Sequence, residues 1–383
     1  MLSPPSDEER RSGEQQSTFA LDFDSILRRH AVPSPDESYV YSPLALGSAL
    51  AMAYEGARGS TRAELGRLIR LESEDDLAGA LGLAVLESTA GVSQRGVFKL
   101  TQANALWCAP NYQPLPSFTA RLRASYRAEL LTGKRDRAPE MDINDWVARA
   151  TGGRLAELLA PDSLRSDTRI VLANVLDVEA TWLQQFHREQ TAMRPFRTID
   201  GKTVQLPTMV AKGNRAVSIG DDYDAVDLVL SDLEHRVLFV VPHAGKFRAF
   251  QHALQGRLKQ IRGSLKPLYV HVELPHFRIE NRLFLRDALA EAGLKLSLSE
   301  TADFGNMVAK RVFLDQVIQG ARFEIDEFGV RATAATALSF PPPSVPPKPR
   351  IIRFDKPFVF LLHNVRTKAI LFAGSFTGDR SHR

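Results

Sequence analysis

The residue types that bind divalent metals lie close together at one point of this sequence. His271, Glu273 and His276 fall within one short stretch, and strand alternation would place His271 and Glu273 on the same face. A zinc site takes three or four protein ligands, and no further partner is visible nearby in the sequence. We therefore interpret the stretch as a solvated strand face, and we predict neither a metal nor another cofactor.

The remaining histidines give no support for hydrolytic chemistry. His30, His187 and His235 lie in no Ser-His-Asp neighbourhood, and the Gly-x-Ser-x-Gly elbow that exposes a nucleophilic serine is absent from the sequence. The single cysteine, Cys108, excludes an intramolecular disulfide. It is most simply a small buried hydrophobe, so we predict that the protein is not an enzyme.

The composition is that of an ordinary globular protein. Of the 383 residues, 44% are hydrophobic and 25% are charged, and the formal net charge of +4 is spread over many side chains. This charge is too weak and too dispersed to indicate nucleic-acid binding. Basic residues gather at 246–266, where we prefer a solvated helical face to a polyanion site. We expect a monomer.

Targeting signals are not visible in the sequence. No apolar stretch reaches the roughly 18 residues that a membrane span requires, and the polar segment 1–17 contains no apolar region of the kind found in a secretory signal. We therefore predict no membrane span, and a cytoplasmic location by default. An extracellular location is the alternative.

Helical patterns come first along the chain, and strand patterns dominate later. Ser42 and Pro43 open a very apolar helix as its N-cap and first helical residue. Strand patterns follow, interrupted by helical segments but without a strict βαβ rhythm, which predicts an α+β fold with mainly antiparallel sheets. We expect a disordered tail over 1–16 and one domain over 17–383. The strand patterns occupy 98–107, 169–176, 204–210, 237–241, 269–274, 313–325, 358–362 and 370–373.

The most informative segment of the chain is 327–347, which reads EFGVRATAATALSFPPPSVPP. From Val330 to Phe340, small or apolar residues alternate with a set that contains the only charge of this stretch, Arg331, and such alternation is typical of a strand. Alanine is nevertheless depleted in strands, and the prolines that follow lack the N–H group that a central strand needs. The pattern predicts a strand small enough to enter a tight slot, followed by a segment that ends it.

Six separated motifs, in the right order from about residue 17 to the C-terminus, resemble signatures of the serpin family. Each motif alone is a weak indication of the family, but six such motifs in this order are hard to produce by chance. The motifs are YSPLALGSALAMAYEGARGSTRAEL (41–65), NDWVARATGGRLAELL (144–159), TRIVLANVLDVEATWLQQF (168–186), VELPHFRIENRLFLRDALAEAGLKLSLSETADF (272–304), FEIDEFGVRATAAT (323–336) and FDKPFVFLLHNVRTKAILFAGSFTGD (354–379).

The resemblance implies a fold of helices around three β-sheets, with an exposed reactive-centre loop at about 327–350. It implies an inhibitor of a serine protease, or of a cysteine protease, that the target attacks as a substrate. The cleaved loop then inserts into the central sheet while the acyl-enzyme persists, and the distorted protease fails to deacylate. A non-inhibitory serpin that acts as a binding or chaperone module is the alternative.

The resemblance also assigns a hinge to the start of the loop. We expect the alternate residues Val330, Ala332 and Ala334 to become buried on insertion, because small side chains ease entry between formed strands. The small residues argue for inhibition, whereas the prolines restrict the choice of target. The hinge residues are Glu327, Gly329, Val330, Ala332, Thr333, Ala334, Ala335 and Thr336.

The scissile bond is expected among the residues around the proline run. Counting from Gly329 as in inhibitory relatives places it near Pro343–Ser344, and bonds that precede a proline are poor protease substrates. Our order of preference is Ser344–Val345, then Pro343–Ser344, then Arg350–Ile351. These bonds suit, respectively, an elastase- or subtilisin-like enzyme, a prolyl-specific enzyme and a trypsin-like enzyme.

A gate beneath the central sheet is the last feature that the resemblance implies. Ser42 and Asn174 match the family pattern, whereas Gln319 stands where relatives often carry a histidine and Ala45 where they usually carry a serine. An amide both donates and accepts hydrogen bonds, so we expect Gln319 to keep polar contacts in the gate. Trp182 matches a family position near the top of the sheet, and a core tryptophan is an equally good interpretation.

Overall fold

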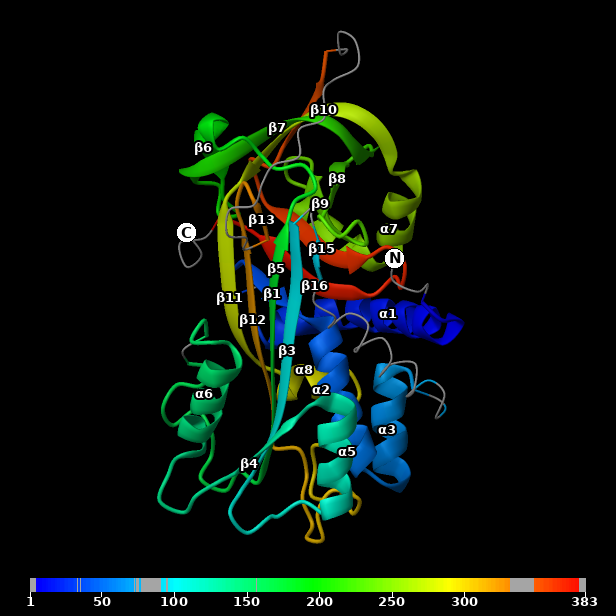
Figure 1. Ribbon diagram of the computed structural model, residues 1–383, viewed down its shortest axis with the longest axis vertical. Helices are drawn as coiled ribbons and strands as arrows, with labels where there is room; N and C mark the ends of the chain where they lie inside the picture. Colours follow the sequence, from blue (N-terminus) through cyan, green and yellow to red (C-terminus); the bar gives the residue numbers. More distant parts are fainter. Residues whose placement is uncertain are drawn as a thin grey trace.

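The computed structural model describes residues 5–32, 34, 36–71, 73, 76, 91–93, 96–155, 157–330 and 348–378. Helices and two β-sheets make up this part of the chain, as the α+β prediction requires (Figure 1). The helices are α1 (Asp7–His30), α2 (Pro43–Gly56), α3 (Gly59–Ile69), α5 (Pro116–Tyr126), α6 (Pro139–Ala150), η1 (Arg188–Gln190), α7 (Phe247–Ser264) and α8 (Arg286–Glu291). None of the helices in the described ranges is both long and apolar enough to cross a membrane.

Seven described strands form the sheet that contains the hinge. Their order is β11-β12-β13-β5-β3-β2, and β4 pairs with β3. The strand β5 is almost wholly buried and pairs antiparallel with β3 from Ile170 to Ala180 and parallel with β12. It is therefore central to the sheet. The strands are β2 (Gly91–Ser93), β3 (Gly96–Cys108), β4 (Glu129–Thr132), β5 (Ile170–Thr181), β11 (Phe277–Phe284), β12 (Gln316–Ile325) and β13 (Gly329–Val330).

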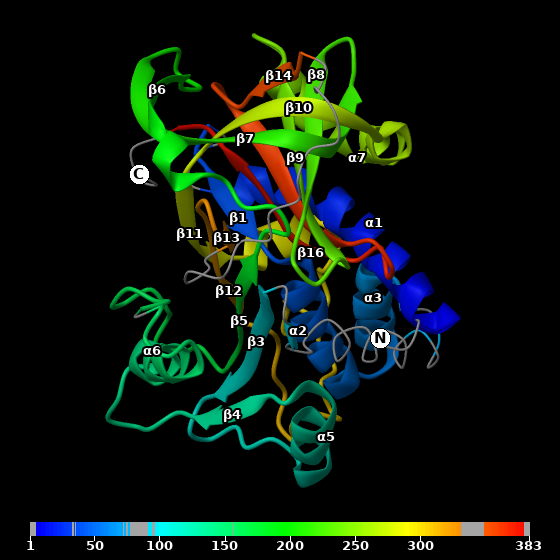
Figure 2. The ribbon, with the colours of Figure 1, turned by 45° about the horizontal axis from the view of Figure 1, so that its top comes forward.

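The second sheet has nine described strands. The long strand β7 pairs with β6 and β10 over much of its length and with β8 at its far end, which joins the strands into one sheet (Figure 2). Its members are β1 (Tyr39–Tyr41), β6 (Ala192–Arg197), β7 (Thr203–Ile219), β8 (Tyr223–Val229), β9 (His235–Pro242), β10 (Lys266–Pro275), β14 (Arg350–Arg353), β15 (Phe358–Asn364) and β16 (Ile370–Phe376).

The helix α1 corrects the prediction of a disordered tail over 1–16, which is wrong from Asp7 onward. Ser6 and Glu9 form a reciprocal capping box at its N-terminus. The Gln16 side chain then donates to the Ile370 carbonyl at 2.8 Å and accepts from the Ile370 N–H at 2.9 Å. Gly13 allows the close approach, since a Cβ there would lie 1.9 Å from the Thr367 carbonyl oxygen. The polar composition of this segment predicted disorder. The residues that hold the helix in place lie far away in the sequence, so no local pattern indicated them.

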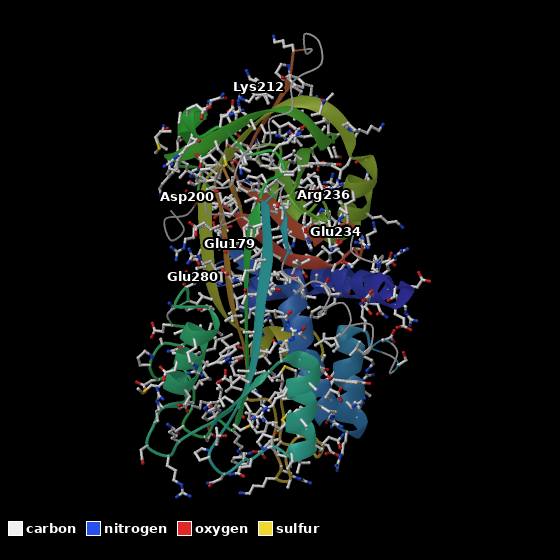
Figure 3. The ribbon with its side chains drawn as sticks, in the orientation of Figure 1. Glu179, Asp200, Lys212, Glu234, Arg236 and Glu280 are labelled. Atoms are coloured by element: carbon white, nitrogen blue, oxygen red, sulfur yellow. The ribbon has the colours of Figure 1, made fainter. Side chains whose placement is uncertain are left out.

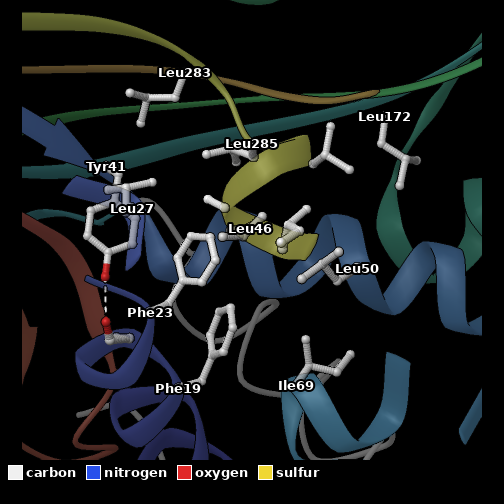
Figure 4. Close-up of a cluster of buried hydrophobic side chains, with 14 of the residues drawn as sticks. Phe19, Phe23, Leu27, Tyr41, Leu46, Leu50, Ile69, Leu172, Leu283 and Leu285 are labelled. Atoms are coloured by element: carbon white, nitrogen blue, oxygen red, sulfur yellow. Dashed lines mark hydrogen bonds between the residues drawn. The ribbon is translucent and has the colours of Figure 1, made fainter. Parts of the chain in front are cut away.

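An aromatic and aliphatic core joins α1, α2 and the sheets (Figure 4). Phe19 and Phe23 stack with their ring centroids 5.5 Å apart, and the Tyr41 hydroxyl donates to the Ala20 carbonyl at 2.5 Å. The helix α2 is buried along most of its length, as its continuous apolar sequence predicts. Cys108 is also buried, which raises the pKa of its thiol to about 12 and agrees with its interpretation as a small hydrophobe.

A buried histidine and aspartate lie in the second sheet. His363 of β15 contacts Asp227 of β8 at 3.1 Å, and both side chains are almost inaccessible to solvent. Arg236, labelled in Figure 3, lies 3.4 Å from the same carboxylate. Burial lowers the pKa of His363 below its usual range, against the hydrogen bond to Asp227 that would raise it. The imidazole is therefore held neutral.

This environment predicts a pH dependence of stability. As pH falls below about 6.5, the unfolded chain protonates His363 before the folded chain does, so protonation favours unfolding. Replacing His363 by Gln should flatten the loss of unfolding free energy between pH 7 and 5, by at most about 1.4 kcal/mol per pH unit. Denaturant titrations across this range measure the slope. His187→Gln, at an exposed histidine, is the control, and equal slopes for wild type and His363→Gln would contradict the assignment.

Candidate functional site

The hinge begins as a two-residue strand inserted at one end of the seven-stranded sheet. Val330 of β13 lies opposite Ala180 of β5 on one side and Ile325 of β12 on the other. Beyond this point β5 and β12 pair directly with each other, from Val171 to Leu176 and from Gln316 to Ala321. The position between β5 and β12 is thus occupied at one end and closed along the rest of the paired segment (Figure 1).

A tight turn leads from β12 into β13. The Asp326 carboxylate accepts hydrogen bonds from the N–H groups of Phe328 and Gly329, at 2.8 and 3.0 Å. Burial raises the pKa of Asp326 above its usual range, although these two hydrogen bonds oppose the change. A Cβ at Gly329 would lie 1.9 Å from the Ala180 carbonyl oxygen. Glycine is therefore required here for close approach to β5.

Trp182 ties this turn to the end of β5. Its backbone N–H donates to the Phe328 carbonyl at 2.8 Å, and its indole N–H donates to the Asp326 carbonyl at 2.9 Å. A third bond runs from the Phe186 N–H to the Glu327 carbonyl at 3.0 Å. Trp182 is buried, but its two polar contacts make it an anchor of the hinge as well as a core residue.

The Glu327 side chain adds contacts with a histidine and a threonine to this turn. It is 5% exposed and lies 2.9 Å from the His276 imidazole, and it accepts from the Thr191 hydroxyl at 2.5 Å. His271, by contrast, lies 3.6 Å from Glu273. The histidines that are close in sequence thus contact different carboxylates, and the described residues contain no group of three or more metal-binding side chains.

Three of the four predicted gate residues meet in one buried cluster. The Gln319 amide oxygen accepts from the Ser42 N–H at 2.7 Å, while its amide nitrogen donates to the Ser42 carbonyl at 3.0 Å and to the Asn174 carbonyl oxygen at 2.8 Å. All three residues are fully buried. Gln319 of β12 thereby connects β5 with the start of α2, whereas Trp182 lies apart from this cluster in the hinge.

The rest of the predicted loop falls outside the described residues. This applies to Ala332, Thr333, Ala334, Ala335, Thr336, Pro343, Ser344 and Val345. The chain is described again from Lys348, and the Arg350–Ile351 bond lies within β14, which pairs parallel with β10. A bond held in a paired strand is a poor protease substrate, so the structure disfavours this third candidate.

Several basic side chains of the region 246–266 are paired or buried in the structure, rather than free on a solvated helical face. Arg248 pairs with Asp36 at 2.6 Å and Arg257 pairs with Asp222 at 2.5 Å. Burial lowers the pKa of Arg262 from its usual range. These contacts attach α7 to the rest of the molecule and reduce the charge available to a polyanion.

The sequence analysis did not predict two features that stabilise the turn between β12 and β13. These are the hydrogen bonds of the Asp326 carboxylate and the contact of His276 with Glu327. The spacing Asp326–Gly329 is a turn signal, because Asp bonds its own backbone two or three residues on and Gly tolerates close approach. The contact of His276 with Glu327 had no such local signal, since it joins residues far apart in the sequence.

Comparison with known proteins covers nearly the whole chain. The family model described as "Serpin (serine protease inhibitor)" matches residues 14–378. A leukocyte elastase inhibitor of Bos taurus is 30% identical over 382 residues, covering 93% of this chain and 96% of the relative.

Solved structures share the fold at lower identity. Serpin48 of the insect Tenebrio molitor, described as a highly specific serpin, superposes with a TM-score of 0.86 at 22% identity, covering 98% of this chain and all of the other. Human thyroxine-binding globulin in complex with thyroxine has the same TM-score at 24% identity, covering 96% of this chain and 98% of the other. The family match spans nearly all of the sequence, and the chain belongs to the serpin family.

Proposed function

We propose that this protein inhibits a serine protease through cleavage of the 331–347 segment and insertion of its first part between β5 and β12. The observation that carries the proposal is the position of Gly329 and Val330, which already occupy one end of that slot. The residues that follow, Ala332 and Ala334, are small on the same alternating side. Insertion would continue a strand that has already begun, as strand addition in this family does.

The covalent step needs little from this chain beyond a suitable bond. The target serine would attack the carbonyl carbon of the bait residue, forming an ester bond and releasing the new amino terminus of the distal segment. Insertion of the proximal segment would carry the attached protease along the sheet. The prolines from Pro341 onward cannot form central ladder bonds, so we place the end of insertion near Phe340.

The alternative is a serpin that only binds a ligand or a partner. The fold does not decide between the two functions, because a thyroxine-binding protein shares it. The small hinge residues favour inhibition, and the likeness to a leukocyte elastase inhibitor favours an elastase-like target that cuts Ser344–Val345.

The bait residue can be identified by incubating the protein with elastase, subtilisin, trypsin and a prolyl endopeptidase. We expect an SDS-resistant complex with elastase or subtilisin. The mass of the released peptide should correspond to a fragment that begins at Val345. Val345→Pro should abolish this complex, whereas Val345→Ala should preserve it. Clean cleavage by every protease, without a complex and without a gain in thermal stability, would instead support the binding-module alternative.

The hinge can be tested with two arginine substitutions one residue apart. Ala334→Arg places a long charged side chain on the side that we expect to be buried, and burying an unpaired charge is strongly unfavourable. It should convert the inhibitor into a substrate and lower the yield of stable complex about tenfold or more. Thr333→Arg, on the side that already carries Arg331, should retain the complex. Equal yields from the two variants would refute the assignment of faces.

The gate predicts a barrier to insertion. Gln319→Ala removes the bond to Asn174 that joins β5 to β12, and the buried partners left unsatisfied should lower the stability of the uncleaved protein by about 1–3 kcal/mol. A synthetic peptide of sequence 330–340 should then insert faster, as measured by the rise in melting temperature with time. Gln316→Ala, whose amide contacts the Arg286 N–H at the start of the strand, is the matched control. Equal insertion rates would show that the gate does not limit opening.

A further inference from the structure

The positive charge of this chain is concentrated on four neighbouring strands of the second sheet. The strands β6, β7, β10 and β14 pair in succession. They contain seven Lys or Arg residues and one Glu, which give a net charge of +6. The formal net charge of the whole chain is only +4, so the remainder carries an excess of negative charge. Charge that is spread along the sequence is therefore gathered in space.

Two carboxylates lie against the cations of these strands. Glu273 of β10 lies 3.3 Å from Arg353 and 3.6 Å from Arg194, so one carboxylate is shared between two guanidinium groups. Asp224 of the adjacent strand β8 lies 3.4 Å from Arg350. These contacts neutralise part of the positive charge and leave more cations than carboxylates.

The turns that border the four strands do not remove the excess. Asp200, Asp222 and Asp355 each pair with a Lys or Arg that lies outside these strands, at 2.5 to 2.9 Å. Asp221 follows β7, and Lys348 precedes β14. When Asp221, Asp224 and Lys348 are added to the count, eight cations face three carboxylates, and an excess of five positive charges remains.

This charge is accessible to solvent. Arg197, Lys212 and Lys266 are exposed, and none of them forms an ion pair with another described residue. The side chains of Arg350 and Arg353 stay 51% and 53% exposed despite their ion pairs. An exposed cluster of one sign produces a field that reaches about 10 Å into solvent at ~0.1 M salt and attracts partners of opposite charge.

The four strands form the end of the molecule at which the reactive segment, 331–347, rejoins the described chain. The strands β7 and β10 lie at the top of Figure 1, β14 lies beside β10 in Figure 2, and Lys212 is labelled at the same end in Figure 3. Val345, which follows the preferred scissile bond, lies three residues before Lys348, a span of at most about 11 Å. A protease that holds this bond in its active site must therefore lie against the charged strands.

We propose that β6, β7, β10 and β14 form a docking surface for the target protease, and that this target carries acidic residues around its active-site cleft. The inference rests on the proposed inhibitory function, because it assigns a charge to the partner in that same reaction. Attraction between the two surfaces accelerates their encounter and makes its rate fall as salt is added.

The sequence next to the scissile bond has the same sign of charge. From Phe328 to Phe354 it contains four Lys or Arg residues and no Asp or Glu. The charge of the docking surface is spread over four strands, and three of its cations already contact carboxylates. This arrangement suits a broad acidic protein surface better than a single chain of closely spaced sulfate groups.

Subtilisin provides a test in which the charge of the protease changes and its active site does not. Succinylation of its lysines replaces ammonium groups by carboxylates, and hydrolysis of a small uncharged peptide calibrates the native and succinylated enzymes. The second-order rate at which the intact reactive segment is lost is then measured from about 0.02 to about 0.5 M sodium chloride. At the lowest salt, succinylation should raise this rate about tenfold or more, and the gain should vanish at the highest salt.

A triple variant removes the unpaired cations of the docking surface. Arg197→Gln, Lys212→Gln and Lys266→Gln together should lower the low-salt rate with succinylated subtilisin about threefold to tenfold. The melting temperature should not change, because the three side chains form no ion pair among the described residues.

The matched control removes the same charge from the opposite end of the molecule. Arg123 lies in α5, and Lys134 and Arg135 follow β4; all three are exposed, and both elements lie at the bottom of Figure 1. Arg123→Gln, Lys134→Gln and Arg135→Gln together should keep the wild-type rate at every salt concentration.

The outcomes separate this inference from the proposed function. Equal rates with the two forms of subtilisin, or with the triple variant and its control, overturn the docking surface even where a stable complex forms. Failure to form an SDS-resistant complex contradicts inhibition instead, while the rate of segment loss still reports on docking. A sulfated oligosaccharide is titrated in parallel. If the triple variant loses oligosaccharide binding but keeps the wild-type rate, the surface serves a polyanion and the proposal is overturned.

Discussion

The direct pairing of β5 with β12 is the constraint on which the rest of the structure depends. These strands run parallel and are joined by Gln319, whose single amide satisfies Asn174 and both backbone groups of Ser42. Buried polar groups that are fully satisfied resist separation, because opening would leave several of them without partners. The same cluster positions the N-terminus of α2 and hence the apolar core beneath the sheet.

At the other end of this strand pair, the two residues of β13 lie between β5 and β12. The turn at Asp326 is held by Trp182 and by the close approach of Gly329 to β5. The described residues therefore combine the start of a strand between β5 and β12 with direct pairing of these two strands farther along. The proposed insertion would require a second packing of this sheet, in which β5 and β12 separate.

The sequence predicted those features that depend on local pattern or on order along the chain. The cap at Ser42 and the series of motifs indicated the buried helix and the family, whereas the alternation after Val330 lies outside the described residues and stays a prediction. Contacts between distant segments were not accessible in this way. Nothing local to His276 indicates Glu327, and nothing in the polar start of the chain indicates that Gln16 contacts Ile370. The separation of Trp182 from the gate, likewise, is a result of three-dimensional packing.

The contact of α1 with β16 bears on how the protein is made. Gln16 and Ile370 are 354 positions apart, and the first strand, β1, also pairs with the last, β16. During synthesis from the N-terminus, α1 and β1 leave the ribosome long before β16 exists, so neither can make its contacts with β16 until almost the whole chain has emerged. Such long-range closure slows folding and prolongs the exposure of apolar surface. A nascent chain that stalls before β16 would leave Gln16 of its earliest helix without its two hydrogen bonds to Ile370.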